Sequence, residues 1–302
     1  MGLSALLASE EAAQHEGMEP NGRGIVAGYD GSDFSMQALD WAMDEAEFRG
    51  VPITVCHAWR SPYGEGDEEA RASLRHAAEH VLWHGAECVR QCTSGVGVRE
   101  DLYEGPAGER LVELSASADL VVVGTRALAG LARRVLGSVA GHVAAHAACP
   151  VIVVRGAGAL PHRVSPGPVV VGVGGGDPHV IEFAFREAAV RALPLLAVQA
   201  WSLPTAVWGA GMAPLVMSEA PGAEVTAALE AAVEPCRRRF PQVEVRLDLV
   251  EGPARDVLVR AAAGATLLVL GATRAPGVLG RLGSVTRPVL GSASCPVAVV
   301  HP

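Results

Sequence analysis

The chain has 302 residues, which is enough for two domains of ordinary size that each bury a core. Its formal net charge of −9 argues against a duplex nucleic-acid surface, and the absence of lysine excludes P-loop and Schiff-base chemistry. Hydrophobic residues make up 50% of the chain, yet no apolar stretch is long enough to predict a membrane-spanning helix.

Residues 1–22 are predicted to form a disordered leader, with Met18 as a second candidate start. The apolar segment Leu3–Ala8 follows no basic residue and leads directly into two glutamates, which is unlike a secretory signal. Without an export signal, the six cysteines are expected to be reduced thiols in a cytoplasmic protein. Cys149 and Cys295 each precede a proline and an apolar run, which predicts that both are buried.

After the leader, strand-like and helix-like segments alternate. Apolar residues recur at helical spacing after Gly28, with acids on the opposite face, which predicts an amphipathic helix. In chain order, the first half is expected to contain strand 24–28, this helix, strand 52–57, helix 68–93, strand 96–103, helix 107–117, strand 120–123, helix 138–146 and strand 151–154.

The second half of the chain repeats the first. DLYEGPAGERLVE is answered by DLVEGPARDVLVR, and CPVIVV by CPVAVV, at an offset near 146 residues, as between Cys149 and Cys295. A repeat of this period is a copied domain rather than a small solenoid unit. We therefore expect a first domain over 23–155, a linker over 156–167 and a second domain over 168–302.

The order of the elements predicts the fold class. Strands separated by helices pair in parallel with right-handed crossovers, and continuous apolar runs such as LVVVG are typical of strands buried on both faces. The expected fold is α/β, with two tandem doubly wound, Rossmann-like parallel-sheet domains.

Two loops of the first copy are suited to hold a nucleotide, because doubly wound sheets bind ligands at the carboxyl ends of their strands. Asp30 and Ser32 follow the first strand, where a carboxylate can accept hydrogen bonds from a ribose or an adenine amino group. Gly124, Gly137 and Ser138 follow the fourth strand, where glycine turns and a helix N-terminus predict an anion site. Ser138 is expected to be the N-cap of that helix; for Asp30, simple capping of the first helix is the alternative.

These motifs together resemble the universal stress protein family. IVAGYDGS and RGVPITVCHAW match the family's first strand and loop and its second strand, and HAACPV matches its ending. The family's nucleotide loop, G-x2-G-x9-G-[ST], is similar to the segment in which Gly124, Ala127, Gly137 and Ser138 occupy the four fixed places. The resemblance covers nearly all of residues 24–301, as two such domains in tandem.

The resemblance implies an ATP site, with or without Mg²⁺, in the first copy. Adenine and ribose contacts fall on Asp30 and on Ala58, just after the second strand. The expected phosphate contacts are Ser32, Gly124, Gly137, Ser138 and Val139. Ala127 belongs to the same loop, although its methyl replaces a glycine where backbone meets phosphate. The resemblance also implies that the two copies pack through their last strands as a pseudo-dimer, and that chains associate as homo-oligomers.

The second copy departs from this pattern. Gly174 answers Asp30 and Gly176 answers Ser32, so the nucleoside carboxylate is lost. Its second loop is one residue shorter but keeps the helix start at Gly283-Ser284. We expect this copy to bind ATP poorly or not at all.

Other clusters of ligating or charged residues are assigned structural roles. Five residues recur every four positions on helix 68–93: His76, His80, His84, Cys88 and Cys92. Because a spacing of four drifts about 40° per step around a helix, they cannot converge on one ion, and no metal site is expected. The pair His142 and His146 is interpreted as structural, and Arg237–Arg239 as a solvated helix end.

The leading hypothesis is a cytoplasmic, ATP-binding stress-response regulatory module with no catalytic residues. It is expected to bind neither nucleic acid nor membranes. Little or no hydrolysis is expected, since the phosphate cradle has no general base, metal-binding carboxylate pair or lysine beside it. The alternative is a scaffold that binds no nucleotide and acts through protein partners, which Ala127 and the degraded second copy favour. An adenylating or phosphoryl-transfer enzyme is disfavoured by the missing lysines and the missing serine-rich loop.

Overall fold

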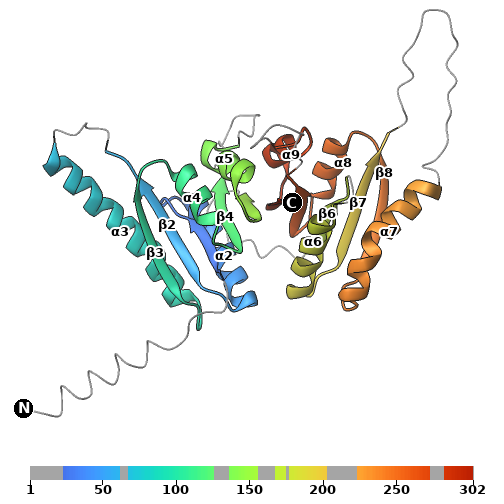
Figure 1. Cartoon of the computed structure of the whole chain (residues 1–302), viewed down its shortest axis with the longest axis horizontal. Helices are drawn as coiled ribbons and strands as arrows, with labels where there is room; N and C mark the ends of the chain where they lie inside the picture. Colours follow the sequence, from blue (N-terminus) through green and yellow to red (C-terminus); the bar gives the residue numbers. More distant parts are fainter. Residues whose placement is uncertain are drawn as a thin grey trace, which may run out of the picture.

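A computed structural model describes residues 23–61, 67–125, 136–155, 167–174, 177–202, 223–272 and 282–301. Strands and helices alternate through both halves, as Figure 1 shows. The elements of the first half are β1 (Ile25–Gly28), α2 (Asp33–Arg49), β2 (Ile53–Trp59), α3 (Glu68–Cys92), β3 (Val98–Glu104), α4 (Ala107–Ser115), β4 (Leu120–Thr125), α5 (Ser138–His146) and β5 (Val151–Arg155). Those of the second half are β6 (Val169–Gly172), α6 (Pro178–Val190), β7 (Leu195–Trp201), α7 (Ala223–Arg239), β8 (Val245–Glu251), α8 (Ala254–Ala261), β9 (Leu267–Gly271), α9 (Thr286–Ser292) and β10 (Val297–Val300).

The ten strands within the described residues form one sheet, in the order β3-β2-β1-β4-β5-β10-β9-β6-β7-β8. Within each half the strands are parallel, which confirms the predicted fold class. The halves join where β5 and β10 pair antiparallel, with Ile152 opposite Ala298. This pairing of the two last strands is the pseudo-dimer that the sequence analysis expected.

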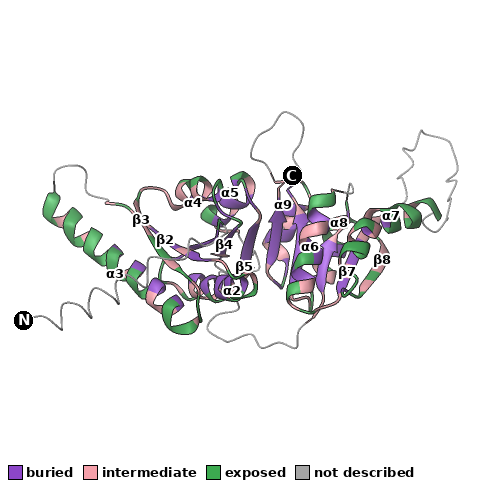
Figure 2. Ribbon diagram, turned by 60° about the horizontal axis from the view of Figure 1, so that its bottom comes forward, coloured by how far each residue is buried: buried purple, intermediate pink, exposed green. Residues whose placement is uncertain are grey.

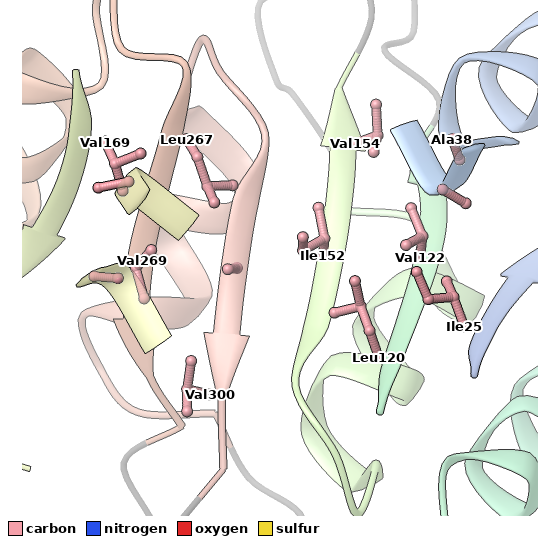
Figure 3. Close-up of a cluster of buried hydrophobic side chains, with 14 of the residues drawn as sticks. Ile25, Ala38, Leu120, Val122, Ile152, Val154, Val169, Leu267, Val269 and Val300 are labelled. Atoms are coloured by element: carbon pink, nitrogen blue, oxygen red, sulfur yellow. The ribbon is translucent and has the colours of Figure 1, made fainter. Parts of the chain in front are cut away.

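Helices cover both faces of the sheet, and each face has one hydrophobic cluster that continues across both halves. The first cluster joins the central strands to α2, α3, α6 and α7. The second joins them to α4, α5, α8 and α9. Figure 2 shows buried residues concentrated in the strands and on the inner sides of the helices. Figure 3 shows side chains of the first cluster on both sides of the junction, including Ile152 and Val300.

Local signals explain several element boundaries. Helix α2 begins after Ser32, whose hydroxyl accepts from the Ser35 N–H at 3.3 Å, and ends at Gly50, which has a φ of +64°. In the second half, the turn after α6 places a non-glycine residue, Ala192, at a φ of +52°. Strand β2 extends to Trp59, two residues beyond the predicted end, because its pairing with β3 continues to Glu104.

Two further structural expectations on described residues are met, one on the cysteines and one on the arginine cluster. Cys149 and Cys295 are buried, which raises the pKa of each thiol to about 12. Arg237–Arg239 form the exposed last turn of α7 and pair with Glu234 and Glu182. Within the described ranges, no helix combines the length and apolar character needed to cross a bilayer.

Truncation of Ile152 tests the shared core. This side chain is fully buried on β5, opposite Ala298 of β10, so Ile152→Ala is expected to lower the free energy of unfolding by about 2–5 kcal/mol. The control is Val190→Ala at the exposed end of α6, where a change within about 0.5 kcal/mol is expected. Denaturant unfolding measures both, and equal effects would contradict the placement of Ile152 at the centre of the core.

Candidate functional site

The candidate site lies where β1, β2 and β4 end, beside the starts of α2 and α5. Parallel strands bring these loops to one edge of the sheet. Gly28 lies opposite Cys56 on β2 and Val123 on β4, so the loop after β1 begins where β2 has three residues and β4 has two residues still to run.

The loop after β1 is organised by the Asp30 carboxylate. Its Oδ1 accepts from the backbone N–H of Ser32 at 3.0 Å and from the Ser32 hydroxyl at 2.5 Å. Ser32 rather than Asp30 is therefore the N-cap of α2, and Asp30 orients the capping residue. Gly31, between them, has a φ of +78°, a conformation that favours glycine. The result is an exposed carboxylate held at the carboxyl end of β1.

Tyr29 fixes this loop to two other elements. Its buried ring lies over Gly85 of α3, where an added Cβ would be 2.6 Å from the ring, and its hydroxyl meets His84 Nδ1 at 2.9 Å. Its carbonyl oxygen is 2.8 Å from His57 Nδ1 on β2. Burial raises the pKa of the Tyr29 hydroxyl. Sequence reasoning missed this clamp; the spacing of α3 pointed only to a ladder that included His84.

Ala58 lies inside β2, paired with Tyr103 of β3, and not just after the strand as predicted. The boundary was misjudged because the strand signal was taken to end at His57, whereas the ladder with β3 runs to Trp59. Ala58 is half-buried, one residue before the end of its strand.

Gly124 is required by packing. An added Cβ there would be 2.3 Å from the carbonyl oxygen of Phe34 in the first turn of α2. The neighbouring Thr125 is buried, and its hydroxyl accepts from the N–H of Gly137 at 3.3 Å. The end of β4 thus holds the starts of both α2 and α5.

The start of α5 corrects one prediction. Gly137 is the N-cap, with no side-chain capping bond, and Ser138 is the first residue within the helix. The glycine already has the extended ψ of a cap, so the helix begins one residue earlier than it would with Ser138 as the cap. Ser138 and Val139 are exposed there. Ala127, the remaining predicted site residue, lies outside the described residues.

The second copy lacks most of these arrangements. Gly174 is exposed where Asp30 stands in the first copy, and α6 is capped by Asp177, whose carboxylate accepts from the His179 N–H at 3.0 Å. Gly176 lies outside the described residues. Helix α9 begins at Thr286, two residues after the expected start at Ser284. The Thr286 hydroxyl donates to the carbonyl of Gly271, in place of the link that Thr125 makes in the first copy.

Metal-ligating side chains and clefts were also searched for outside the nucleotide loops. Among the described residues, no group of three His, Cys, Asp or Glu side chains is placed to hold a metal ion. A cleft of about 430 Å³ opens between the start of α3 and the ends of β2 and β3. It is lined by Trp59, Glu68, Arg71, Ala72, Arg75, Leu102 and Glu104, none of which is a predicted site residue.

Comparison with known proteins gives the same result twice along the chain. The profile of the Universal stress protein family matches residues 23–155 and again 167–301. A universal stress protein of Mycobacterium tuberculosis strain H37Rv is 31% identical over 302 residues, covering 92% of this chain and 97% of the relative. One of Mycolicibacterium smegmatis is 31% identical over 293 residues, with the same coverage. The crystal structure of a universal stress protein from Archaeoglobus fulgidus superposes with a TM-score of 0.72 at 18% identity, covering 93% of this chain and 99% of that one, which shows the shared fold.

Alanine substitutions at two glycines test whether Gly124 is required by packing. Gly124→Ala is expected to lower the free energy of unfolding by about 1–3 kcal/mol, because the new Cβ would overlap the Phe34 carbonyl. Gly137→Ala is the control, since its nearest new contact is 3.7 Å away and its φ is negative; we expect a cost below about 1 kcal/mol. Thermal unfolding of both variants measures the difference. A Gly124→Ala protein as stable as wild type would show that α2 does not press on β4.

Proposed function

Because this chain belongs to the universal stress protein family and carries its domain twice, we propose that it is an ATP-binding regulatory module in which only the first copy binds the nucleotide. The observation that carries the proposal is the exposed carboxylate of Asp30, held at the carboxyl end of β1 by Ser32. The second copy has Gly174 at this place and offers no side chain there.

In the proposed complex, the nucleoside lies against Asp30 and Ala58. An ionised carboxylate there accepts hydrogen bonds from ribose hydroxyls or from the adenine amino group. The half-buried methyl group of Ala58, at the end of β2, supplies an apolar contact for the base. The Tyr29 clamp to α3 and to His57 supports this arrangement, because it limits the movement of the residue before Asp30.

The phosphates in this proposal lie at the start of α5. Its first N–H groups have no partner within the helix, and the helix dipole favours negative charge at this end. Ser138 and Val139 are exposed at that point, and Gly137 is positioned by its bond to Thr125. Mg²⁺ bound to the phosphates is compatible with such a cradle. Little hydrolysis is expected, since the chain has no lysine to neutralise the transferred phosphate.

We extend the proposal to a cytoplasmic location and to association of chains as dimers. The six cysteines are free thiols, which suits a reducing compartment. Since β5 and β10 already pair with each other, association of two chains would use other surfaces.

The second candidate function is a scaffold that binds no nucleotide. Gly124 favours it, because the contact with Phe34 explains that glycine without any ligand. The Asp30 loop opposes it, since Ser32 is the cap of α2 and the Asp30 carboxylate that orients it remains exposed at the end of β1.

Calorimetry with purified protein should give one ATP per chain. The second copy lacks the paired side chains of Asp30 and Ser32, so its site should contribute no measurable heat. The matched control is a chain with Asp30→Ala, in which the binding heat should weaken strongly. Two equivalent sites per chain would contradict the asymmetry.

Asp30→Ala should weaken ATP binding about ten- to a hundredfold while leaving the fold intact. The estimate follows from a hydrogen bond to a charged group, which contributes about 1.5–3 kcal/mol. Asp33→Ala, three residues further along the chain, is the control for loss of a nearby negative charge and should bind normally. If Asp30→Ala binds as tightly as wild type, Asp30 serves only to orient Ser32.

A further inference from the structure

Four charged side chains meet where the two halves join. Helices α2 and α6 flank the β5–β10 junction on the same face of the sheet, as Figures 1 and 2 show. Glu45 and Arg49 come from α2, Glu187 comes from α6, and Arg191 is the C-cap that follows α6. We call these four residues the junction ring.

Each carboxylate of the junction ring contacts both guanidinium groups. Glu45 pairs with Arg49 of its own helix at 2.9 Å and with Arg191 of the other half. Glu187 pairs with Arg191 of its own half and with Arg49 of the other half. Charges of opposite sign therefore alternate around a closed ring, and two of its four links join the halves.

The junction ring follows the repeat. Glu187 and Arg191 are the counterparts of Glu45 and Arg49, at the same offset that relates Trp59 to Trp201 in the following strands. The aromatic neighbours of the two arginines do not follow the repeat. Arg191 lies 5.0 Å from the ring centre of Trp41 and 5.5 Å from that of Phe48, both on α2.

The two carboxylates are almost completely removed from water, with exposed fractions of 0% for Glu45 and 1% for Glu187. One nitrogen, Nη2 of Arg49, contacts both of them, so two like charges share a dry site. Loss of the second proton from such a pair is opposed by burial and by repulsion, against the attraction of the arginines. Burial first and Glu45 second raise the pKa of the Glu187 carboxyl to about 7, against the effects of Arg191 and Arg49.

The charged groups around Glu187 are the other three members of the junction ring. Asp44 precedes Glu45 on α2 and lies near Arg191. Burial raises the pKa of the Asp44 carboxyl. Beneath the ring, β10 carries only apolar residues, and so does β5 before Arg155. The Arg155 guanidinium donates to the carbonyl of Leu290 on α9.

We propose that the junction ring is a proton-sensitive lock between the two halves, tightest when Glu187 holds a proton. In this state one carboxyl group is neutral, and the remaining carboxylate is shared by two arginines. As the pH rises, Glu187 loses its proton, two anions face each other in the dry site, and the junction loosens.

The sign follows from proton linkage. A carboxyl whose pKa is raised from 4.5 to about 7 by folding gives stability that is fully present below 4.5 and is lost as the pH rises through 7. Between pH 6 and pH 8 the equilibrium constant for docking of the two halves should fall roughly tenfold. The effect needs no nucleotide, so it can be tested whether or not the first copy binds ATP.

Carbon-13 NMR of the full chain, labelled at the glutamate carboxyl carbons, tests the proton directly. We expect one glutamate signal to titrate near pH 7, and to be missing from Glu187→Gln. Glu45→Gln should move the Glu187 titration to lower pH, because it removes the neighbouring charge. The proposal is overturned if the signal of Glu187 titrates below about pH 5.

Hydrogen exchange tests the lock. After correction for intrinsic rates, the amides of Val297–Val300 should lose protection roughly tenfold between pH 6 and pH 8 in wild type, and not in Glu187→Gln. Strand β2, in the outer part of the sheet, is the internal reference, and Glu230→Gln on the exposed side of α7 is the matched control. Equal protection at both pH values in wild type would overturn the proposal, as would the same loss in Glu187→Gln.

Discussion

The rest of the structure depends on the antiparallel pairing of β5 with β10. These strands are central and buried on both faces, so each half completes the hydrophobic clusters of the other. Polar contacts join the halves on both faces of this pair. The junction ring lies on one face, and on the other the His301 ring is 3.1 Å from the carbonyl oxygens of Cys149 and Ala144. The fused sheet is therefore a unit that neither half completes alone.

Within this shared sheet, the two copies have become unequal at the ends of their strands. The first copy keeps Tyr29, held by His57 and α3, and an exposed Asp30 ordered through Ser32. The corresponding residues of the second copy are Val173, Gln199 and Gly174. The core residues show no such loss, because strands of both copies are equally buried. We propose that the first copy binds the nucleotide and that the second copy supports the sheet.

The fold could be predicted because its signals are local and occur twice. Alternating strands and helices and the CPVIVV and CPVAVV endings required no knowledge of distant contacts. The Tyr29–His84 contact was missed because it joins residues 55 apart through the packing of α3. The junction ring was missed for a related reason: Glu–Arg pairs four residues apart are typical of solvated helix faces, and only the meeting of the two halves buries them. At Ser138 the error was a shift of one residue in the start of α5, a boundary that residue type alone does not decide.

The central claim, that the nucleotide lies at the first copy alone, is tested most directly by photoaffinity labelling of the full chain with 8-azido-ATP and peptide mapping. The account predicts label within residues 23–155, close to Asp30 and Ala58, removed by excess ATP and weakened in Asp30→Ala. Label within residues 167–301 that ATP removes equally well would contradict it, and so would label in either half that ATP does not compete.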